Sequence, residues 1–209
     1  MQLFATKYPL GWGSLDLPML GISTDWNRQA LHPPAAFTLC TDGVKLWFVA
    51  TRQAPATIHP DAAAGAFTPE LWKQDVAELF IADPDGVEYL EFNLAANGAW
   101  WACKFDSVRK PSASQPDFMA AATTHHDTSE PDSWLAALVI PVAFLKEHIG
   151  FGLSSRANVA FILNSPEQTF HTASKLPGTE PNFHQPQSFQ RLIPAKPPAQ
   201  EALLQLGVR

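Results

Sequence analysis

The sequence predicts an all-β protein, a two-sheet antiparallel β-sandwich of the immunoglobulin or jelly-roll type with one short helix. Short apolar segments alternate with turn sequences such as Asp42-Gly43 and Asn97-Gly98. The 19 prolines and 11 glycines are spread along the chain, which is typical of many short strands joined by turns. At 209 residues and 46% hydrophobic content, the chain is long enough for one large sandwich with a real core.

The predicted strands follow one another at short intervals. They span residues 37–40, 44–51, 75–82, 87–94, 99–105, 133–141 and 158–164. Asp42-Gly43 joins the first two strands in a hairpin, because both residues of such a turn need a positive φ. Asp83-Pro-Asp-Gly86 joins the next two, and Asn97-Gly98 leads into the fifth. The sixth is apolar at nearly every position, which indicates a strand covered on both faces.

The segments between these strands are predicted to be loops, apart from one helix. The long loops are expected at residues 53–70, 106–131 and 171–188. Residues 142–148 fit about two turns of helix, ended by Gly150 and Gly152. We expect a single domain over residues 1–193 and a C-terminal tail over 194–209, with a short amphipathic piece at 201–206.

Composition narrows the classes of function. The net charge is −6 and only 16% of residues are charged, which argues against nucleic acid and against a charged membrane surface. The sequence has no signal-peptide pattern and no apolar stretch of transmembrane length, so a cytoplasmic location is expected. Two cysteines, Cys40 and Cys103, make neither a disulfide framework nor a zinc cluster; both are expected to be buried and reduced.

Strand alternation sorts the second hairpin and the strand after it into two faces. The expected core face holds Ala77, Leu79, Ile81, Leu90, Phe92, Leu94, Trp101, Cys103 and Phe105. The opposite face holds Glu78, Tyr89, Glu91, Asn93, Trp100 and Lys104. Carboxylate, amide and aromatic groups on one face suit a polyhydroxylated ligand, although a solvated sheet face would show the same alternation. Glu78 and Glu91 are expected to be reachable by solvent.

Trp72 directly precedes the strand that carries Glu78. Tryptophan at a loop-to-strand junction can present a flat apolar wall with one N–H donor, on which the C–H face of a sugar stacks. The alternative is that Trp72 caps the core. Its polar neighbours, Lys73 to Asp75, favour a place at the mouth of a loop.

Two motifs resemble the family 9 carbohydrate-binding modules and the wider group of DOMON-like sandwiches. The first is Leu71-Trp72-x-x-Asp75-x-x-Glu78-Leu-Phe-Ile81, followed by Tyr89-x-Glu-Phe-Asn93 and, later, Asn158-Val-Ala-Phe161. The second is Pro181-Asn-Phe-His184-x-Pro186-x-x-Phe189. The resemblance covers residues 37–193 and implies a sandwich that binds a saccharide or another small polar ligand between two aromatic walls.

The resemblance also assigns roles to individual residues. Trp72 is in position for one wall, Glu78 for a carboxylate that grips hydroxyl groups, and Asn158 for a strand asparagine. No second tryptophan precedes the Phe-His motif, and Phe183 or His184 are the substitutes for that wall. The family carries structural calcium, but no dense Asp/Glu/Asn loop in this chain compels it.

Other functions have weaker support. Glu78 and Glu91 form a conceivable glycosidase pair, but nothing in the sequence raises either pKa, and no catalytic motif is present. The run His125-His126-Asp127 fits a solvated loop better than a metal site. The main alternative is a structural or protein-interaction module that has lost sugar binding. A haem-binding DOMON relative is a minor one, because only Met19 and Met119 could serve and neither lies in a matching motif.

Overall fold

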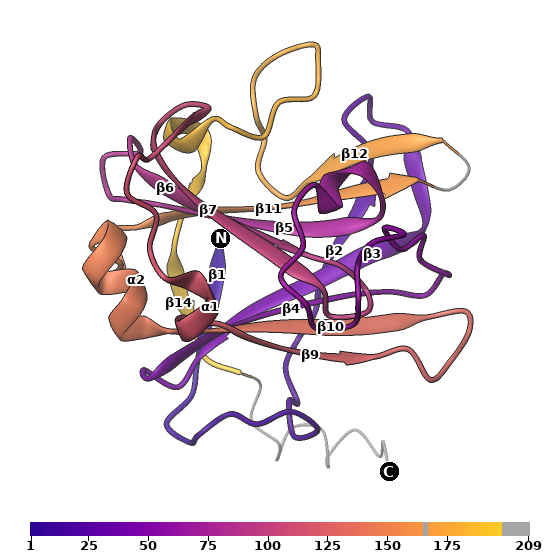
Figure 1. Ribbon diagram of the computed structural model, residues 1–209, viewed down its shortest axis with the longest axis horizontal. Helices are drawn as coiled ribbons and strands as arrows, with labels where there is room; N and C mark the ends of the chain where they lie inside the picture. Colours follow the sequence, from indigo (N-terminus) through magenta and orange to yellow (C-terminus); the bar gives the residue numbers. More distant parts are fainter. Residues whose placement is uncertain (165–166, 198–209) are drawn as a thin grey trace.

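The computed structural model describes residues 1–164 and 167–197, which fold into two seven-stranded sheets packed face to face (Figure 1). Sheet A contains β1 (Gln2–Ala5), β2 (Leu20–Thr24), β3 (Ala30–Thr41), β4 (Lys45–Arg52), β9 (Thr123–Asp127), β10 (Trp134–Pro141) and β14 (Ile193–Ala195). Sheet B contains β5 (Val76–Ala82), β6 (Tyr89–Leu94), β7 (Trp100–Ser107), β8 (Lys110–Pro111), β11 (Arg156–Asn164), β12 (Gln168–Thr172) and β13 (Gln190–Arg191). The predicted all-β sandwich is confirmed.

The strand order runs β14-β1-β3-β4-β10-β9 in sheet A, with β2 beside β3, and β12-β11-β5-β6-β7-β8 in sheet B, with β13 beside β11. All pairs are antiparallel except β1 with β14 and β1 with β3. β14 continues sheet A through Ala195, two residues past the expected end of the domain at residue 193. The predicted amphipathic piece at 201–206 lies outside the described residues.

The helical elements are short. They are α1 (Phe118–Ala121), α2 (Val142–Ile149), and the 3-10 turns η1 (Leu71–Lys73) and η2 (Pro186–Ser188). α2 is the predicted helix, and it lies at one end of the sandwich (Figure 1). It ends at Ile149, and the next residue, Gly150, takes the left-handed conformation with φ 60°, which costs glycine little.

Segment 106–131 is not one long loop, as the sequence predicted. It contains β8, α1 and β9. β9 pairs with β10 from Leu135↔Asp127 to Val139↔Thr123 and forms an edge of sheet A. Its residues are polar, so its strand conformation comes from pairing with the apolar β10 and not from a hydrophobic pattern of its own.

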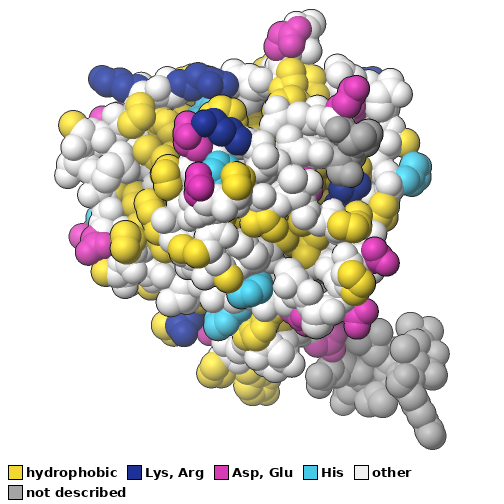
Figure 2. Space-filling view, turned by 45° about the vertical axis from the view of Figure 1, so that its right-hand side comes forward, with side chains coloured by type: hydrophobic (Ala, Val, Ile, Leu, Met, Phe, Trp, Pro, Cys, Tyr) yellow, Lys and Arg dark blue, Asp and Glu magenta, His cyan; other side chains and the backbone are white. Residues whose placement is uncertain are grey.

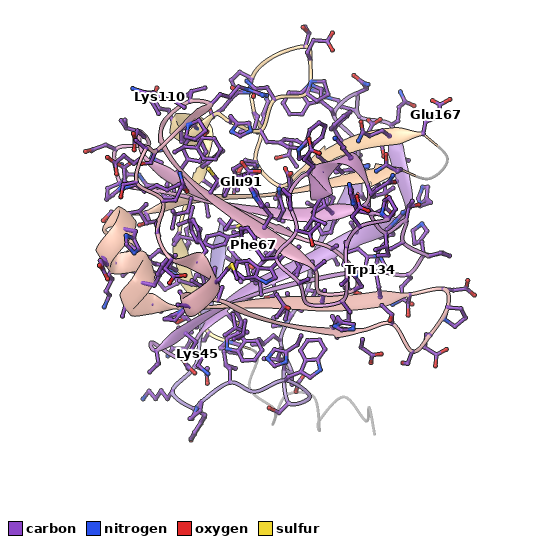
Figure 3. The ribbon with its side chains drawn as sticks, in the orientation of Figure 1. Lys45, Phe67, Glu91, Lys110, Trp134 and Glu167 are labelled. Carbon is purple, nitrogen blue, oxygen red and sulfur yellow. The ribbon has the colours of Figure 1, made fainter. Side chains whose placement is uncertain are left out.

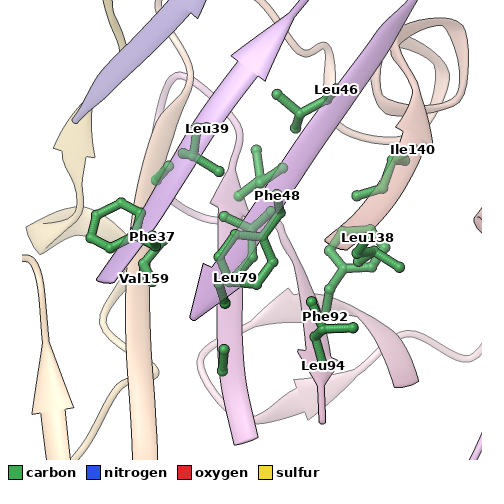
Figure 4. Packing of buried hydrophobic residues seen from close by; sticks show 14 of the residues in the cluster. Phe37, Leu39, Leu46, Phe48, Leu79, Phe92, Leu94, Leu138, Ile140 and Val159 are labelled. Atoms are coloured by element: carbon green, nitrogen blue, oxygen red, sulfur yellow. The ribbon is translucent and has the colours of Figure 1, made fainter. Parts of the chain in front are cut away.

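The main core lies between the two sheets. Figure 4 shows side chains from β3, β4, β5, β6, β10 and β11 meeting there, among them Phe37, Phe48, Leu79, Phe92 and Val159. The expected core residues Leu79, Ile81, Leu90 and Phe92 are all buried. The hydrophobic alternation of β5 and β6 therefore predicted their register correctly.

The predicted register of β7 is wrong. Trp100 pairs with Leu94, and Cys103 pairs with Glu91. Trp100 therefore points into the main core, while Trp101, Cys103 and Phe105 lie on the other face of sheet B. The stretch from Ala99 to Cys103 has no polar residue to mark the outward face, and a shift of one residue exchanges every side chain between faces.

Both outer faces of the sandwich are covered as well. A cluster around Phe80, Tyr89, Phe105, Phe183 and Phe189 lies outside sheet B. Another lies outside sheet A, where Leu10, Trp12, Leu15 and Leu17 pack on Trp47 and its neighbours. Cys40 belongs to the cluster outside sheet A and Cys103 to the cluster outside sheet B, and both are free and buried.

Charged side chains of both signs stand beside hydrophobic and histidine side chains on the face drawn in Figure 2. On this face the positive side chains do not form a patch of one sign, which is what binding of a polyanion requires. Within residues 1–164 and 167–197, no helix is long and apolar enough to cross a membrane.

Candidate ligand-binding site

A pocket of about 450 Å³ opens on the outer face of sheet B. Its apolar lining comes from Trp72, Trp101, Phe105, Ile162, Phe170, Pro181 and Phe183. Its polar lining comes from Glu78, Glu91, Arg109 and His184. Pockets of this kind, mostly aromatic with a few polar groups that converge, are typical of small-molecule sites.

Sheet B positions the two carboxyl groups. Glu78 on β5 pairs with Asn93 on β6, and Phe80 pairs with Glu91. Glu78 and Glu91 are therefore diagonal neighbours on one face of adjacent antiparallel strands, which is within reach of long side chains. The sequence correctly placed Glu78, Glu91, Asn93 and Tyr89 on a common face.

The carboxyl groups are more deeply placed than the sequence predicted. Glu78 is 3% exposed and Glu91 is 5% exposed, so the expectation that solvent reaches them freely is wrong. The cover comes from segments outside the sheet, chiefly the chain around Phe183 and the turn that carries Arg109. Figure 3 shows Glu91 among side chains between sheet B and these loops.

Glu91 is only partly satisfied by its neighbours. Asn93 Nδ2 donates to Glu91 Oε1 at 3.2 Å, while Oε2 is buried with no hydrogen-bond partner in the described residues. Burial raises the pKa of Glu91 to about 7, against the opposing effects of the Asn93 hydrogen bond and the Arg109 charge. Near neutral pH this group therefore gains or loses a proton readily.

Glu78 has less compensation still. Among the described residues, no hydrogen bond stabilises its ionised carboxyl. Burial, and then the like charge of Glu91, raise its pKa well above the ordinary value, although Arg109 acts in the other direction. These pKa shifts could not be predicted from the sequence, because they arise from loops that fold over the sheet.

Tyr89 and Arg109 hold His184 in place. The Tyr89 hydroxyl lies 2.8 Å from His184 Nδ1, and the Arg109 backbone N–H donates to the same hydroxyl at 3.1 Å. Burial and the Arg109 charge lower the pKa of His184 to about 4. His184 Nε2 lies 3.8 Å from Glu91 Oε2, but this histidine is neutral near pH 7, so the two do not form an ion pair there.

Arg109 is the cationic group of the lining. It adopts φ 55°, a left-handed conformation, in the turn between β7 and β8. Its guanidinium Nη2 donates to Asn182 Oδ1 at 3.0 Å, which ties this turn to the Phe183 segment. A lone arginine in a polar stretch gave no sequence signal for this role.

Trp72 stands at the mouth of the pocket. It lies in η1 and is 47% exposed, so it does not cap the core. Gln168 Nε2 donates to its backbone oxygen at 3.3 Å, which links η1 to β12. The Lys73 ammonium, paired with Glu70 at 2.7 Å, lies 5.8 Å from the centre of the indole ring.

Three other residues predicted for the site do not line the pocket. Trp100 is in the main core, where its ring meets Phe67 edge-on at 5.0 Å, so its predicted place on the binding face is wrong. Asn93 is fully buried beside Glu91. Asn158 is also fully buried, and its Oδ1 accepts hydrogen bonds from Thr172 Oγ1 at 2.9 Å and Ser174 N at 3.0 Å. Asn158 thus joins β11 to the chain after β12.

Phe183 and His184 do line the pocket, and several lining residues were missed. The missed ones are Trp101, Phe105, Arg109, Ile162, Phe170 and Pro181. Correct registration of β7 would have found the first two. The aromatic groups Trp101 and Phe170 also line the pocket, whereas the sequence predicted only Phe183 and His184 as substitutes for a second wall.

Metal ligands do not gather in the described chain. No group of three or more His, Cys, Asp or Glu side chains that could hold a metal ion occurs in residues 1–164 and 167–197. His125 is not in a solvated loop as predicted. It lies in β9, stacked between Trp12 at 5.4 Å and Trp47 at 5.6 Å.

Comparisons with known proteins identify the fold. A protein from Bacteroides uniformis, provisionally described as carbohydrate-binding, superposes with a TM-score of 0.72 at 14% identity, covering 93% of this chain and 98% of the other. A family 9 carbohydrate-binding module from Caldicellulosiruptor kristjanssonii, solved with glucose, gives 0.62 at 12% identity, covering 95% and 98%. The same kind of module from that organism, solved with cellotriose, gives 0.61 at 11%, covering 96% and 96%.

The sequence itself matches no protein-family model and no curated protein. At these low identities the structural likeness establishes the fold alone. The chain has the fold of a family 9 carbohydrate-binding module.

Proposed function

We propose that this protein is a non-catalytic module that binds a saccharide in the pocket on the outer face of sheet B. One observation carries the proposal: two carboxyl groups, Glu78 and Glu91, lie on the floor of a pocket whose walls are aromatic. The floor offers acceptors for hydroxyl groups, and the walls offer surfaces for the C–H faces of a sugar ring.

The unfilled hydrogen-bonding capacity of the floor supports this proposal. Glu91 Oε2 has no partner among the described residues, and a buried acceptor without a partner is costly. A sugar hydroxyl that donates to this oxygen would remove the cost on binding. His184, held neutral, can exchange hydrogen bonds with a hydroxyl group without adding charge.

The position of Trp72 also supports it. Its ring is half-exposed beside the pocket, so stacking on a sugar would bury apolar area that water now covers. The structural neighbours with this fold that were solved with glucose and with cellotriose are consistent with a saccharide as the ligand class.

Glycoside hydrolysis is the second candidate function. It is favoured by the buried acid pair, because burial raises the pKa of Glu91 to about 7, as a catalytic acid requires. Two points favour binding alone. Glu78 and Glu91 have no catalytic motif beside them, and carbohydrate-binding modules are non-catalytic. A protein-interaction module remains the other alternative, whereas Met19 and Met119, the residues considered for haem, do not line this pocket.

Isothermal titration with glucose, xylose, cellobiose and cellotriose tests the proposal. We expect binding to at least one of them, and Trp72→Ala should weaken it by about 1–3 kcal/mol, the value of burying one large apolar side chain. Trp12→Ala is a matched control, because Trp12 packs outside sheet A, on the opposite side of the sandwich. No saccharide binding at millimolar concentration would exclude the proposal, and release of reducing ends from the oligosaccharides would favour hydrolysis.

A further inference from the structure

We propose that the pocket selects saccharides that carry a protonated amino group, with the ammonium bound at Glu78 between the sheet and the aromatic walls. This inference rests on the proposed saccharide binding and specifies the ligand class of the same pocket. It comes from the charges of the lining, from the unpartnered acid groups and from their position relative to Arg109.

When both acids are ionised, the charges of the lining do not balance. Glu78 and Glu91 are two acids, and Arg109 is the cation that faces them among the lining residues. His184 is neutral near pH 7, since burial and Arg109 lower its pKa to about 4. Lys73 does not line the pocket, and its ammonium is engaged by Glu70 at 2.7 Å.

Arg109 belongs to the Glu91 end of the pocket. Its backbone N–H donates to the Tyr89 hydroxyl, and its guanidinium donates to Asn182 Oδ1. Tyr89 is two residues before Glu91 on β6, on the same face. The guanidinium is therefore already engaged by Asn182, although its charge still acts on Glu78.

Glu78 lies at the apolar end. Glu78 on β5 pairs with Ala160 on β11. The next residues on the same face are Val76 on β5 and Ile162 on β11. Phe170 pairs with Ile162 across β12, and Trp72 precedes β5. A cation at Glu78 would lie beside aromatic groups, which attract cations when water is excluded.

A protonated amine satisfies this end better than a hydroxyl group does. A hydroxyl donates one hydrogen bond and does not compensate the charge of an ionised Glu78, so burial continues to favour the protonated carboxyl. An ammonium donates up to three hydrogen bonds and neutralises the carboxylate, and a charge-assisted bond of this kind is the stronger one. Burial of a carboxylate is tolerated when an opposite charge accompanies it.

The test is calorimetric titration at neutral pH with glucosamine, glucose and N-acetylglucosamine, which share one ring and differ at one substituent. We expect glucosamine to bind about ten-fold more tightly than glucose, in line with one charge-assisted hydrogen bond, and N-acetylglucosamine to lose this advantage. Raising the salt concentration should lower the glucosamine-to-glucose affinity ratio only weakly. Salt screens a buried ion pair less than it screens an exposed one.

Glu78→Gln keeps the shape of the side chain and removes its charge, so it should bring the glucosamine-to-glucose affinity ratio close to one. Glu88→Gln is the matched control, because Glu88 is half-exposed, pairs with Lys104 and does not line the pocket, and it should leave the ratio unchanged. If Glu78→Gln fails to fold, as judged by its melting curve, Glu91→Gln serves in its place, and it should lower the same ratio.

The outcomes separate the two proposals. Glucose binding as tightly as glucosamine, or an unchanged ratio in the Glu78→Gln protein, would overturn the amine preference and leave saccharide binding intact. Absence of binding by every sugar would exclude the proposed function and the amine preference together.

Discussion

The Tyr89 hydroxyl and His184 Nδ1, which are 95 residues apart in the sequence, lie 2.8 Å from each other across the edge of the pocket. The same hydroxyl accepts a hydrogen bond from the Arg109 backbone N–H at 3.1 Å. One phenol group on β6 therefore fastens two separate loops to sheet B. Those loops supply Arg109, Phe183 and His184 to the lining, so the pocket depends on this junction.

Tyr89→Phe should loosen the cover of the pocket. The change removes the hydroxyl and leaves two polar groups without their partner, so we expect the free energy of unfolding to fall by about 1–3 kcal/mol. Saccharide affinity should fall as well, because Arg109 and His184 are no longer held. Urea denaturation and calorimetric titration measure the two effects. Tyr8→Phe is the matched control, since Tyr8 is 79% exposed, and it should change neither quantity.

The two neighbouring tryptophans of β7 should respond in opposite ways to substitution. Trp100 is buried in the main core, so Trp100→Ala should lower the free energy of unfolding by about 3–5 kcal/mol. Trp101 lines the pocket and is partly exposed. Trp101→Ala should therefore lower the free energy of unfolding less than Trp100→Ala does, and should weaken saccharide binding more. Denaturant unfolding and saccharide titration of both variants check this. A larger stability loss for Trp101→Ala would mean that the β7 register is the one first predicted from the sequence.

The fold could be predicted where residues carry their own signals. Asp42-Gly43 marks the turn between β3 and β4, and polar residues alternate with apolar ones in β5 and β6 strongly enough to set their faces. β7 has no such alternation, and β9 is polar throughout. Pairing with β6 sets the register of β7, and pairing with β10 makes β9 a strand, whereas their own sequences specify neither.

The site could be predicted only in part, for a related reason. Glu78 and Glu91 share a face because they sit on adjacent strands of one hairpin, which is local information. Arg109, Phe170 and Phe183 reach the same pocket from distant segments, and nothing in their immediate sequence specifies that destination. Burial of the two carboxyl groups follows from those segments, so the shifts in pKa were equally invisible in the sequence.

Phe92→Ala tests the packing between the sheets. Phe92 is fully buried on the core face of β6 and meets Phe118 edge-on at 5.8 Å. Truncation should lower the free energy of unfolding by about 3–5 kcal/mol, since the cavity it leaves adds to the lost burial. Val87→Ala, at an exposed position before the same strand, is the control and should change little. Denaturant melts in which Phe92→Ala loses less than about 1 kcal/mol would contradict the register of β6.

The pH dependence of stability should report the buried acid pair. Burial raises the pKa of Glu91 from 4.5 to about 7, so between these values the folded protein holds a proton that the unfolded chain has released. By linkage, this group contributes stability that is fully present below pH 4.5 and is lost as the pH rises through 7. Glu78 shifts in the same direction.

His184 acts with the opposite sign, which makes the wild-type curve a mixture. Its pKa falls from 6.5 to about 4, so its contribution is present above pH 6.5 and is lost as the pH falls through 4. Comparison with Glu91→Gln separates the two effects, because that variant keeps His184 and lacks one titrating acid. The variant should gain stability relative to the wild type as the pH rises from 4.5 to 7, by up to about 3 kcal/mol.

Urea denaturation at a series of pH values across this window measures the difference. Glu88→Gln is the control, because Glu88 is half-exposed and does not line the pocket, and its difference from the wild type should stay nearly constant with pH. A Glu91→Gln difference that is also constant would show that the carboxyl is ionised throughout and well solvated. In that case water reaches the pocket floor, and Glu91 titrates as it does in the unfolded chain.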